Sequence, residues 1–263
     1  MKSVIMKKEI EREIGRILRE KDRGIVSKEM AVRKILRALQ KDVRAEIAEA
    51  AIGSWDAHYL PKMLSAIDAM VKSTGNELKN IAKEGMDEMI GKGHDMVDIP
   101  LDRGGIYVSM PRMSPTVMDA FQDFAFHKLD DVSQAAFEKI RTELTMGILG
   151  QKTPQEVAGA IGKNLKDPSV FRSIAQRAET ITQTEMGRVF SKATQSRMEE
   201  AAEYVERLEK EWRHVGHPKV PRASHLAAHG EHVPVNEPFS IGGVSMMFPR
   251  DPGAPIEEVI HCG

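Results

Sequence analysis

The residues best suited to chemistry are gathered in the last segment of the chain, from position 210 to 263. Most of the nine histidines and the single cysteine fall there, among short apolar runs broken by Pro and Gly. Imidazole and thiolate groups are common zinc ligands. His225 and His229 are four residues apart and would share one face of a helix, and Cys262 would supply a third ligand.

Three interpretations of these residues stay open. In the first, His225, His229 and Cys262 hold a structural zinc. In the second, His225 is hydrogen-bonded inside a small fold and Cys262 is a small buried residue. In the third, the segment is a metal-dependent hydrolase, nuclease or toxin-like enzyme with His225 as its acid–base group. Zinc proteases place Glu directly after the first His, but Leu226 stands there. We therefore expect a protein that is not an enzyme, and no cofactor other than the structural zinc alternative.

The elements that must position these residues are short strands and turns. We expect a strand over 211–215 anchored by Trp212, and a short helix within 220–230 capped by Ser224. The runs 233–235 and 244–248 are expected to pair as strands, with a turn at Gly242–Gly243. A cluster of turn residues follows over 249–253, in which Asp251 is expected to form the turn. A last strand is expected over 259–262.

A long helix is predicted ahead of this segment, over about 169–208. In its centre, Glu185 and Arg188 are three residues apart and can pair. Two interpretations of the pair stay open: a salt bridge on the surface, or a buried polar clamp onto the module that follows.

The first two thirds of the chain predict further helices. Apolar residues at helical spacing indicate helices over 3–22 and 27–47, separated at Gly24, and over 60–90, interrupted at Gly75 and Gly85. A loop or hairpin is expected at about 91–113, with a turn at Gly104–Gly105 and a strand at 106–110. Helix returns from Ser114 to Gly147. Thr153 and Glu156 form a capping-box pattern around Pro154, which predicts the start of a helix. Asp167–Pro168 is a weaker signal of the same kind, a capping residue followed by proline.

The N-terminal helices carry an excess of positive charge. Positions 1–46 hold 14 Lys and Arg against 8 Asp and Glu, an excess of six. One interpretation is an ordinary solvated surface; the other is a face that meets double-stranded DNA, without reading its sequence, or an acidic partner. The residues proposed for such a face are Lys7, Lys8, Arg12, Arg16, Arg19, Arg33, Lys34 and Arg37.

Bulk properties limit the classes of protein that fit. The 263 residues carry a formal net charge of −1, so global charge does not indicate a nucleic-acid-wrapping protein. One cysteine permits no internal disulfide. No apolar run is long enough for a membrane span, and the charged N-terminus is unlike a signal peptide. The expected fold is mainly α: a long helical region, 1–168, followed by a small α+β module within 169–263, whose β-rich part is 210–263.

The ordered motifs of the last hundred residues resemble those of the head-morphogenesis family of tailed bacteriophages, the Mu protein F-like minor head proteins. The resemblance covers about 170–263. The residues that carry it are Arg177, Glu179, Thr184, Glu185, Arg188, Trp212, Arg222, Ser224, His225, Gly230, Phe239, Pro249, Asp251, Pro252 and Cys262.

The resemblance implies a structural role in a virion. Such a protein would be made in the bacterial cytoplasm and lie inside the capsid near the portal vertex. Its partners would be the portal protein, other capsid proteins and packaged DNA, and it would act in head assembly and in DNA packaging, retention or ejection. The chain departs from the family pattern in two places. His217–Pro218 stands where an acidic residue is common. The end, Ile260 to Gly263, lacks the family's second cysteine, and we expect a chain shortened at this point.

Overall fold

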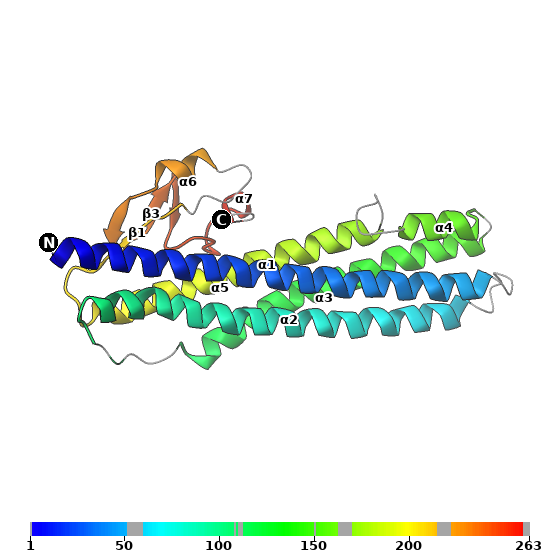
Figure 1. Ribbon diagram of the computed structural model, residues 1–263. Coiled ribbons are helices and arrows are strands. Elements are labelled where there is room, and N and C mark those ends of the chain that lie inside the picture. Colours follow the sequence, from blue (N-terminus) through cyan, green and yellow to red (C-terminus); the bar gives the residue numbers. More distant parts are fainter. Residues whose placement is uncertain are drawn as a thin grey trace. The chain divides into compact units, whose positions relative to one another are not determined.

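The computed structural model describes residues 2–51, 60–107, 109, 113–149, 151–162, 170–214 and 222–259. Helices account for most of these residues, and the strands are confined to the C-terminal part (Figure 1). The predicted fold class, mainly α with a small α+β module at the end, is confirmed. The chain divides into two compact units, one made of 1–26, 84–122 and 183–263, the other of 27–83 and 123–182.

Helix α1 (Lys2–Ala51) is one continuous element, so the predicted separation at Gly24 is wrong. Its buried positions recur every three or four residues, which places them on one side of the helix. A Cβ on Gly24 would lie 2.9 Å from the carboxylate of Glu88 and 3.0 Å from the methyl group of Met89. Gly24 therefore permits close packing by the neighbouring helix.

Helix α2 (Leu60–Arg103) also continues through the glycines at which interruptions were predicted, Gly75 and Gly85. Residues 91–103 belong to this helix, so the predicted loop or hairpin over 91–113 is wrong in that part. The predicted turn at Gly104–Gly105 does follow the helix. Of the predicted strand 106–110, the described residues Ile106, Tyr107 and Ser109 are not in a strand, and the other two positions lie outside the described residues.

Three more helices follow: α3 (Pro115–Ile148), α4 (Pro154–Ile161) and α5 (Val170–Ala202). The capping box predicted ahead of α4 is confirmed. The amide of Glu156 donates to the Thr153 hydroxyl at 3.2 Å, and the amide of Thr153 donates to the Glu156 carboxylate at 2.7 Å. The weaker cap at 167–168 lies outside the described residues.

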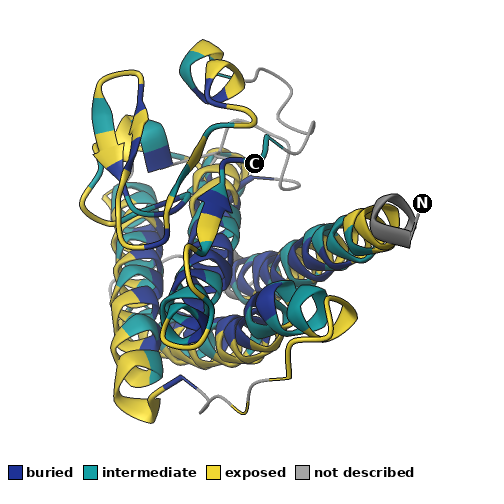
Figure 2. Cartoon of the chain, turned by 90° about the vertical axis from the view of Figure 1, so that its left-hand side faces the viewer, coloured by how far each residue is buried: buried dark blue, intermediate teal, exposed yellow. Residues whose placement is uncertain are grey.

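One apolar core fills the unit formed by 27–83 and 123–182. It is built from the facing stripes of α1, α2 and α3 with α4 and the start of α5, and its fully buried side chains include Leu36, Ile67, Leu129, Ile140 and Phe171. In Figure 2, buried and exposed residues lie on different sides of the long helices that the view shows clearly. At the surface of this unit, Arg33 binds Glu179 through two hydrogen bonds of 2.7 Å each.

In the other unit, the helical segments bring α2 and α5 close together. A Cβ on Gly93 would lie 2.6 Å from the Cβ of Ala193 and 2.8 Å from the carbonyl oxygen of Phe190. A residue larger than glycine would force the two helices apart at this crossing. The C-terminal half of α5 therefore has α2 on one side and offers another side to the module that follows it.

The C-terminal module contains two small antiparallel sheets. Strand β1 (Glu209–Glu211) pairs with β2 (His232–Pro234), and β3 (Phe239–Ile241) pairs with β4 (Val244–Met246). The predicted turn at Gly242–Gly243 is confirmed: both residues have positive φ, 60° and 85°, which suits a tight hairpin. The predicted pairing of 233–235 with 244–248 is wrong, because each run pairs with a different strand.

Other boundaries in the module also differ from the predictions. The first strand begins two residues earlier, and Trp212 follows it directly. Ser224 lies inside α6 (Ala223–Ala227), whose cap residue is Arg222, because the helix starts two residues before it was expected. Val259 ends α7 (Ile256–Val259), so it is not in a strand; the rest of the predicted last strand lies outside the described residues.

Candidate functional site

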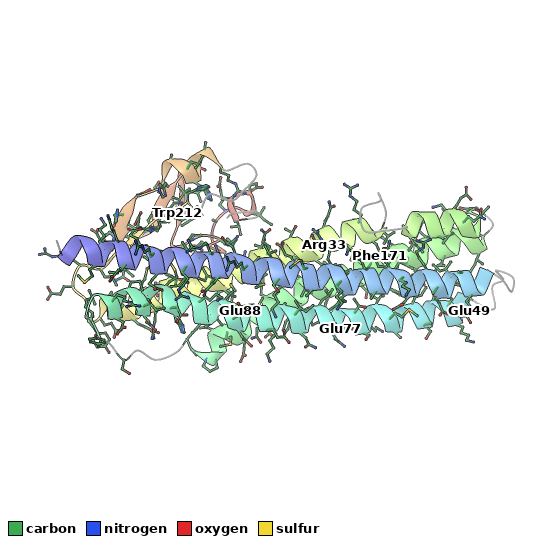
Figure 3. The ribbon with its side chains drawn as sticks, viewed as in Figure 1. Arg33, Glu49, Glu77, Glu88, Phe171 and Trp212 are labelled. Carbon is green, nitrogen blue, oxygen red and sulfur yellow. The ribbon has the colours of Figure 1, made fainter. Side chains whose placement is uncertain are left out.

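Trp212 is the centre of the small core of the C-terminal module. Its side chain is 3% exposed and lies within the module in Figure 3. The rings of His225 and Phe239 meet it edge-on, with centroids at 5.6 Å and 5.2 Å. Such T-shaped pairs set the positive edge of one ring against the negative face of the other. The rings therefore hold α6 and the β3–β4 hairpin against the indole.

His225 is held by polar contacts as well. It is 5% exposed, and its Nε2 lies 2.8 Å from a carboxylate oxygen of Glu258 in α7. Arg222 contacts the same short helix through the carbonyl oxygen of Glu257 and lies 3.8 Å from the Glu258 carboxylate. The interpretation of His225 as a hydrogen-bonded residue within a small fold is confirmed.

Asp251 shapes the turn after the second hairpin, as predicted. One of its carboxylate oxygens accepts a hydrogen bond from the amide of Met247 at 2.8 Å, and the other accepts from the amide of Gly253 at 2.9 Å. These bonds satisfy two backbone donors that no strand uses. They also fix the preceding residue, Arg250, which has a φ of 64° and is buried.

Helix α5 receives this turn through a buried ion pair. The carboxylate of Glu185 accepts a hydrogen bond from Arg188, and the two side chains are only 2% and 7% exposed. Arg188 Nε also donates to the carbonyl oxygen of Arg250 at 3.1 Å. The alternative of a buried polar clamp onto the following module is therefore confirmed, and the alternative of a surface salt bridge is wrong.

Gly187 lies between the two clamp residues. A Cβ there would be 1.8 Å from Nη1 and 2.3 Å from Cζ of Arg250, closer than any real contact. Glycine therefore leaves the space in which the guanidinium group of Arg250 lies against the backbone of α5.

A second attachment is made by Lys210 of β1, which is 4% exposed. Its ammonium group donates to the Gln195 side chain at 3.1 Å and to the carbonyl oxygen of Met247 at 2.8 Å. The same amide side chain of α5 donates to the carbonyl oxygen of Val235 at 2.9 Å. Burial lowers the pKa of Lys210 to about 8, against the opposing effect of the nearby carboxylates of Glu199 and Asp251.

The proposed zinc ligands are not gathered by the described structure. Helix α6 ends at Ala227, before His229, whose Nδ1 accepts a hydrogen bond from the amide of His214 at 3.1 Å. The helical face that His225 and His229 were expected to share is therefore absent. Among the described residues, no group of three His, Cys, Asp or Glu side chains is arranged to hold a metal ion. Cys262 lies outside the described residues, so the structural zinc alternative stays a prediction.

Most of the residues that carry the family resemblance meet in this module or on the part of α5 beneath it. Glu185 contacts Arg188, and Trp212 contacts His225, Gly230 and Phe239. Arg222 contacts α7, and Asp251 contacts the backbone of its own turn. Ser224 packs against Gly242, Thr184 is buried, and Pro249 and Pro252 flank the Asp251 turn. Arg177 and Glu179 belong to the other unit, where Arg177 is exposed.

The residues proposed for a DNA-binding face are all exposed, but two of them are already engaged. Arg16 pairs with Glu13 at 2.9 Å and with Glu20 at 2.7 Å. Arg33 pairs with Glu179. Lys7, Lys8, Arg12, Arg19, Lys34 and Arg37 are exposed on α1.

Four residues of the site were not predicted: Gly187, Lys210, Arg250 and Glu258. Gly187 lies between Glu185 and Arg188, the pair that the sequence predicted, so a glycine at this place in a helix was a usable signal. The others act across distances of 15 to 62 residues in sequence, which spacing alone does not reveal.

No protein family, curated protein or solved structure matches this chain. No helix in the described part of the chain is long and apolar enough to cross a membrane. Function must therefore be inferred from the residues and their geometry.

Proposed function

We propose that this chain is a minor head protein of a tailed bacteriophage, a structural component of the virion that associates with the portal and with packaged DNA. The support is the ordered set of motif residues in 170–263 that resembles the Mu protein F-like family. The observation that carries the proposal is the use of these residues: Trp212, His225 and Asp251 hold the module together, and Arg188 attaches it to α5.

This arrangement suits assembly better than catalysis. The buried polar side chains of Arg188, Lys210 and His225 bind other side chains and backbone carbonyl oxygens, which makes a rigid attachment. His225, the acid–base group of the enzyme alternative, is buried against Trp212 and Glu258. An acid–base group must reach the proton that it transfers. In the proposed role, the long helices would contact the portal and capsid inside the head. The module would stabilise α5, the helix to which it is attached.

The test is the composition of virus particles made from the genome that encodes this chain. We expect the chain in DNA-filled heads purified by density gradient and analysed by mass spectrometry. The Trp212→Ala substitution removes the side chain at the centre of the module. Most of the altered chain should then be missing from the particles. Leu226→Ala, at a side chain that is 45% exposed, should leave incorporation unchanged.

Absence of the unaltered chain from DNA-filled particles would contradict the proposal. The enzyme alternative predicts something different for His225→Ala: loss of a nuclease or hydrolase activity that the unaltered chain displays, with no change in melting temperature. The structural role predicts a lower melting temperature and no activity to lose.

A further inference from the structure

The outward side of α1 carries a row of basic side chains. Taken in steps of three or four residues, its positions are 8, 12, 16, 19, 23, 26, 30, 34, 37 and 41. Eight of them are Lys or Arg, Val26 and Met30 fill the other two, and none is Asp or Glu. The steps average about 3.7 residues, close to one helical turn, so within each unit, over 8–26 and over 30–41, the row keeps to one side of α1. All ten side chains are exposed.

Ion pairs decide which members of the row can meet a ligand. Arg16 is engaged by Glu13 and Glu20. Among the residues that the structure describes, no carboxylate lies within ion-pair distance of the seven others. They are Lys8, Arg12, Arg19 and Arg23 in one unit, and Lys34, Arg37 and Lys41 in the other.

The geometry of the row and its ion pairs change the set of DNA-binding residues that the sequence predicted. Arg23 and Lys41 join it because they continue the row. Arg16 and Arg33 leave it because carboxylates occupy them, and Lys7 leaves it because it falls outside the steps of the row.

We propose that this basic row binds the phosphates of double-stranded DNA without reading its sequence. DNA presents one negative charge per about 1.7 Å of its axis, which is about three charges for each step of about 5.5 Å along the row, and the long Lys and Arg side chains can turn toward these phosphates. The inference rests on the proposed function for the choice of DNA among linear polyanions, and it deepens that function by assigning the surface that makes the contact.

The structure favours DNA over an anionic membrane. Basic amphipathic helices bind membranes by inserting their apolar face into the lipid. The apolar face of α1 is occupied, since Val32, Leu36 and Val43 are buried in the core of their unit. The row itself offers only Val26 and Met30, too little apolar surface for insertion.

The test measures binding of the full chain to a 30-base-pair duplex by fluorescence anisotropy over a series of salt concentrations. Seven phosphate contacts predict a slope of about −6 for log K against log salt. The variant Lys8→Gln/Arg12→Gln/Arg19→Gln/Arg23→Gln should make the slope shallower by about 3.6, and Lys34→Gln/Arg37→Gln/Lys41→Gln by about 2.7.

The matched control removes four exposed positive charges from α2, α3 and α5, at positions where the described residues place no carboxylate within ion-pair distance. The variant Lys62→Gln/Lys83→Gln/Lys139→Gln/Arg177→Gln has the same net charge as the first variant and should keep the slope of the unaltered chain. Circular dichroism should give the same helical signal for all four proteins, because every substitution is at an exposed position.

Three outcomes would overturn the inference: an equal change in slope for the control, a more than tenfold preference between two unrelated duplexes, or tighter binding to phosphatidylglycerol vesicles than to DNA. A failure here is distinguishable from failure of the proposed function. Incorporation into particles is measured on the unaltered chain and does not require the isolated chain to bind DNA.

Discussion

The positive charge of Lys210 is destabilising at its buried position, because the ammonium group has lost most of its contact with water. Its ammonium group is buried between β1, α5 and the turn at Met247, and the two groups that accept its hydrogen bonds, the Gln195 side chain and the Met247 carbonyl oxygen, are both neutral. The ring of Phe239 adds a cation–π contact at 5.2 Å. Burial outweighs the attraction of the nearby carboxylates of Glu199 and Asp251, and the pKa of Lys210 falls to about 8.

The lowered pKa of Lys210 predicts a pH dependence of stability. The ordinary value is 10.5 and the folded value is about 8, so between these pH values the unfolded chain binds the proton and the folded chain does not. The free energy of unfolding should therefore rise with pH across this window, by at most about 3 kcal/mol, and be lost again as pH falls through 8.

The measurement is urea unfolding at pH 7.5, 9 and 10.5 for the unaltered chain and for Lys210→Met. The Met side chain fills similar space without a titrating group. The difference in unfolding free energy between the two proteins should shift in favour of the unaltered chain as pH rises. A difference that stays constant across the three pH values would show that Lys210 titrates normally.

At the scale of elements, the turn that carries Arg250 lies close against the backbone of α5 at Gly187. Gly187→Ala would place a methyl group against the buried guanidinium group. Alanine favours a helix over glycine by about 1 kcal/mol, whereas overpacking costs about 1–3 kcal/mol. We expect net destabilisation, read as a lower urea midpoint.

Gly91→Ala is the matched control for Gly187→Ala, because a Cβ at this helical glycine of α2 meets nothing within 4 Å. It should raise stability by up to about 1 kcal/mol. In an Arg250→Ala background, Gly187→Ala should lose its cost, since the clashing group is gone. Equal behaviour of the two glycine variants would argue against close packing at Gly187.

The sequence predicted which segments are helical but not where the helices are broken. Apolar stripes and the Thr153 capping box are local patterns, and both are confirmed. Glycine is locally a poor helix former, which predicted breaks at Gly24 and Gly75. Those glycines instead make room for side chains of Glu88, Met89 and Ser133, contacts that spacing does not encode.

The candidate site was predicted in its parts but not in its assembly. The residue types at Trp212, His225 and Asp251 indicated an anchor, a hydrogen-bonded imidazole and a turn, and each is confirmed. The strand pairing was wrong because the partner of β2 is β1, more than twenty residues earlier. The buried character of Glu185 and Arg188 depends on the turn that covers them, far along the chain.

At the scale of the whole molecule, the chain consists of two units, each with its own core. One is a helical unit built on a single apolar core. The other combines helical segments with the C-terminal module, whose core surrounds Trp212. The central claim is that α5 and the module form one cooperative structural element, because buried polar contacts join them at Arg188, Gln195 and Lys210.

Native-state hydrogen exchange of the unaltered chain and of Arg188→Gln tests this claim most directly. Removing one partner of a buried ion pair costs about 3–5 kcal/mol, a loss of protection of 100-fold or more. The account predicts that the amides of α5 within 183–195 and those of the β3–β4 hairpin, 239–246, lose protection by the same factor. Loss in one of these segments with full protection in the other would contradict it.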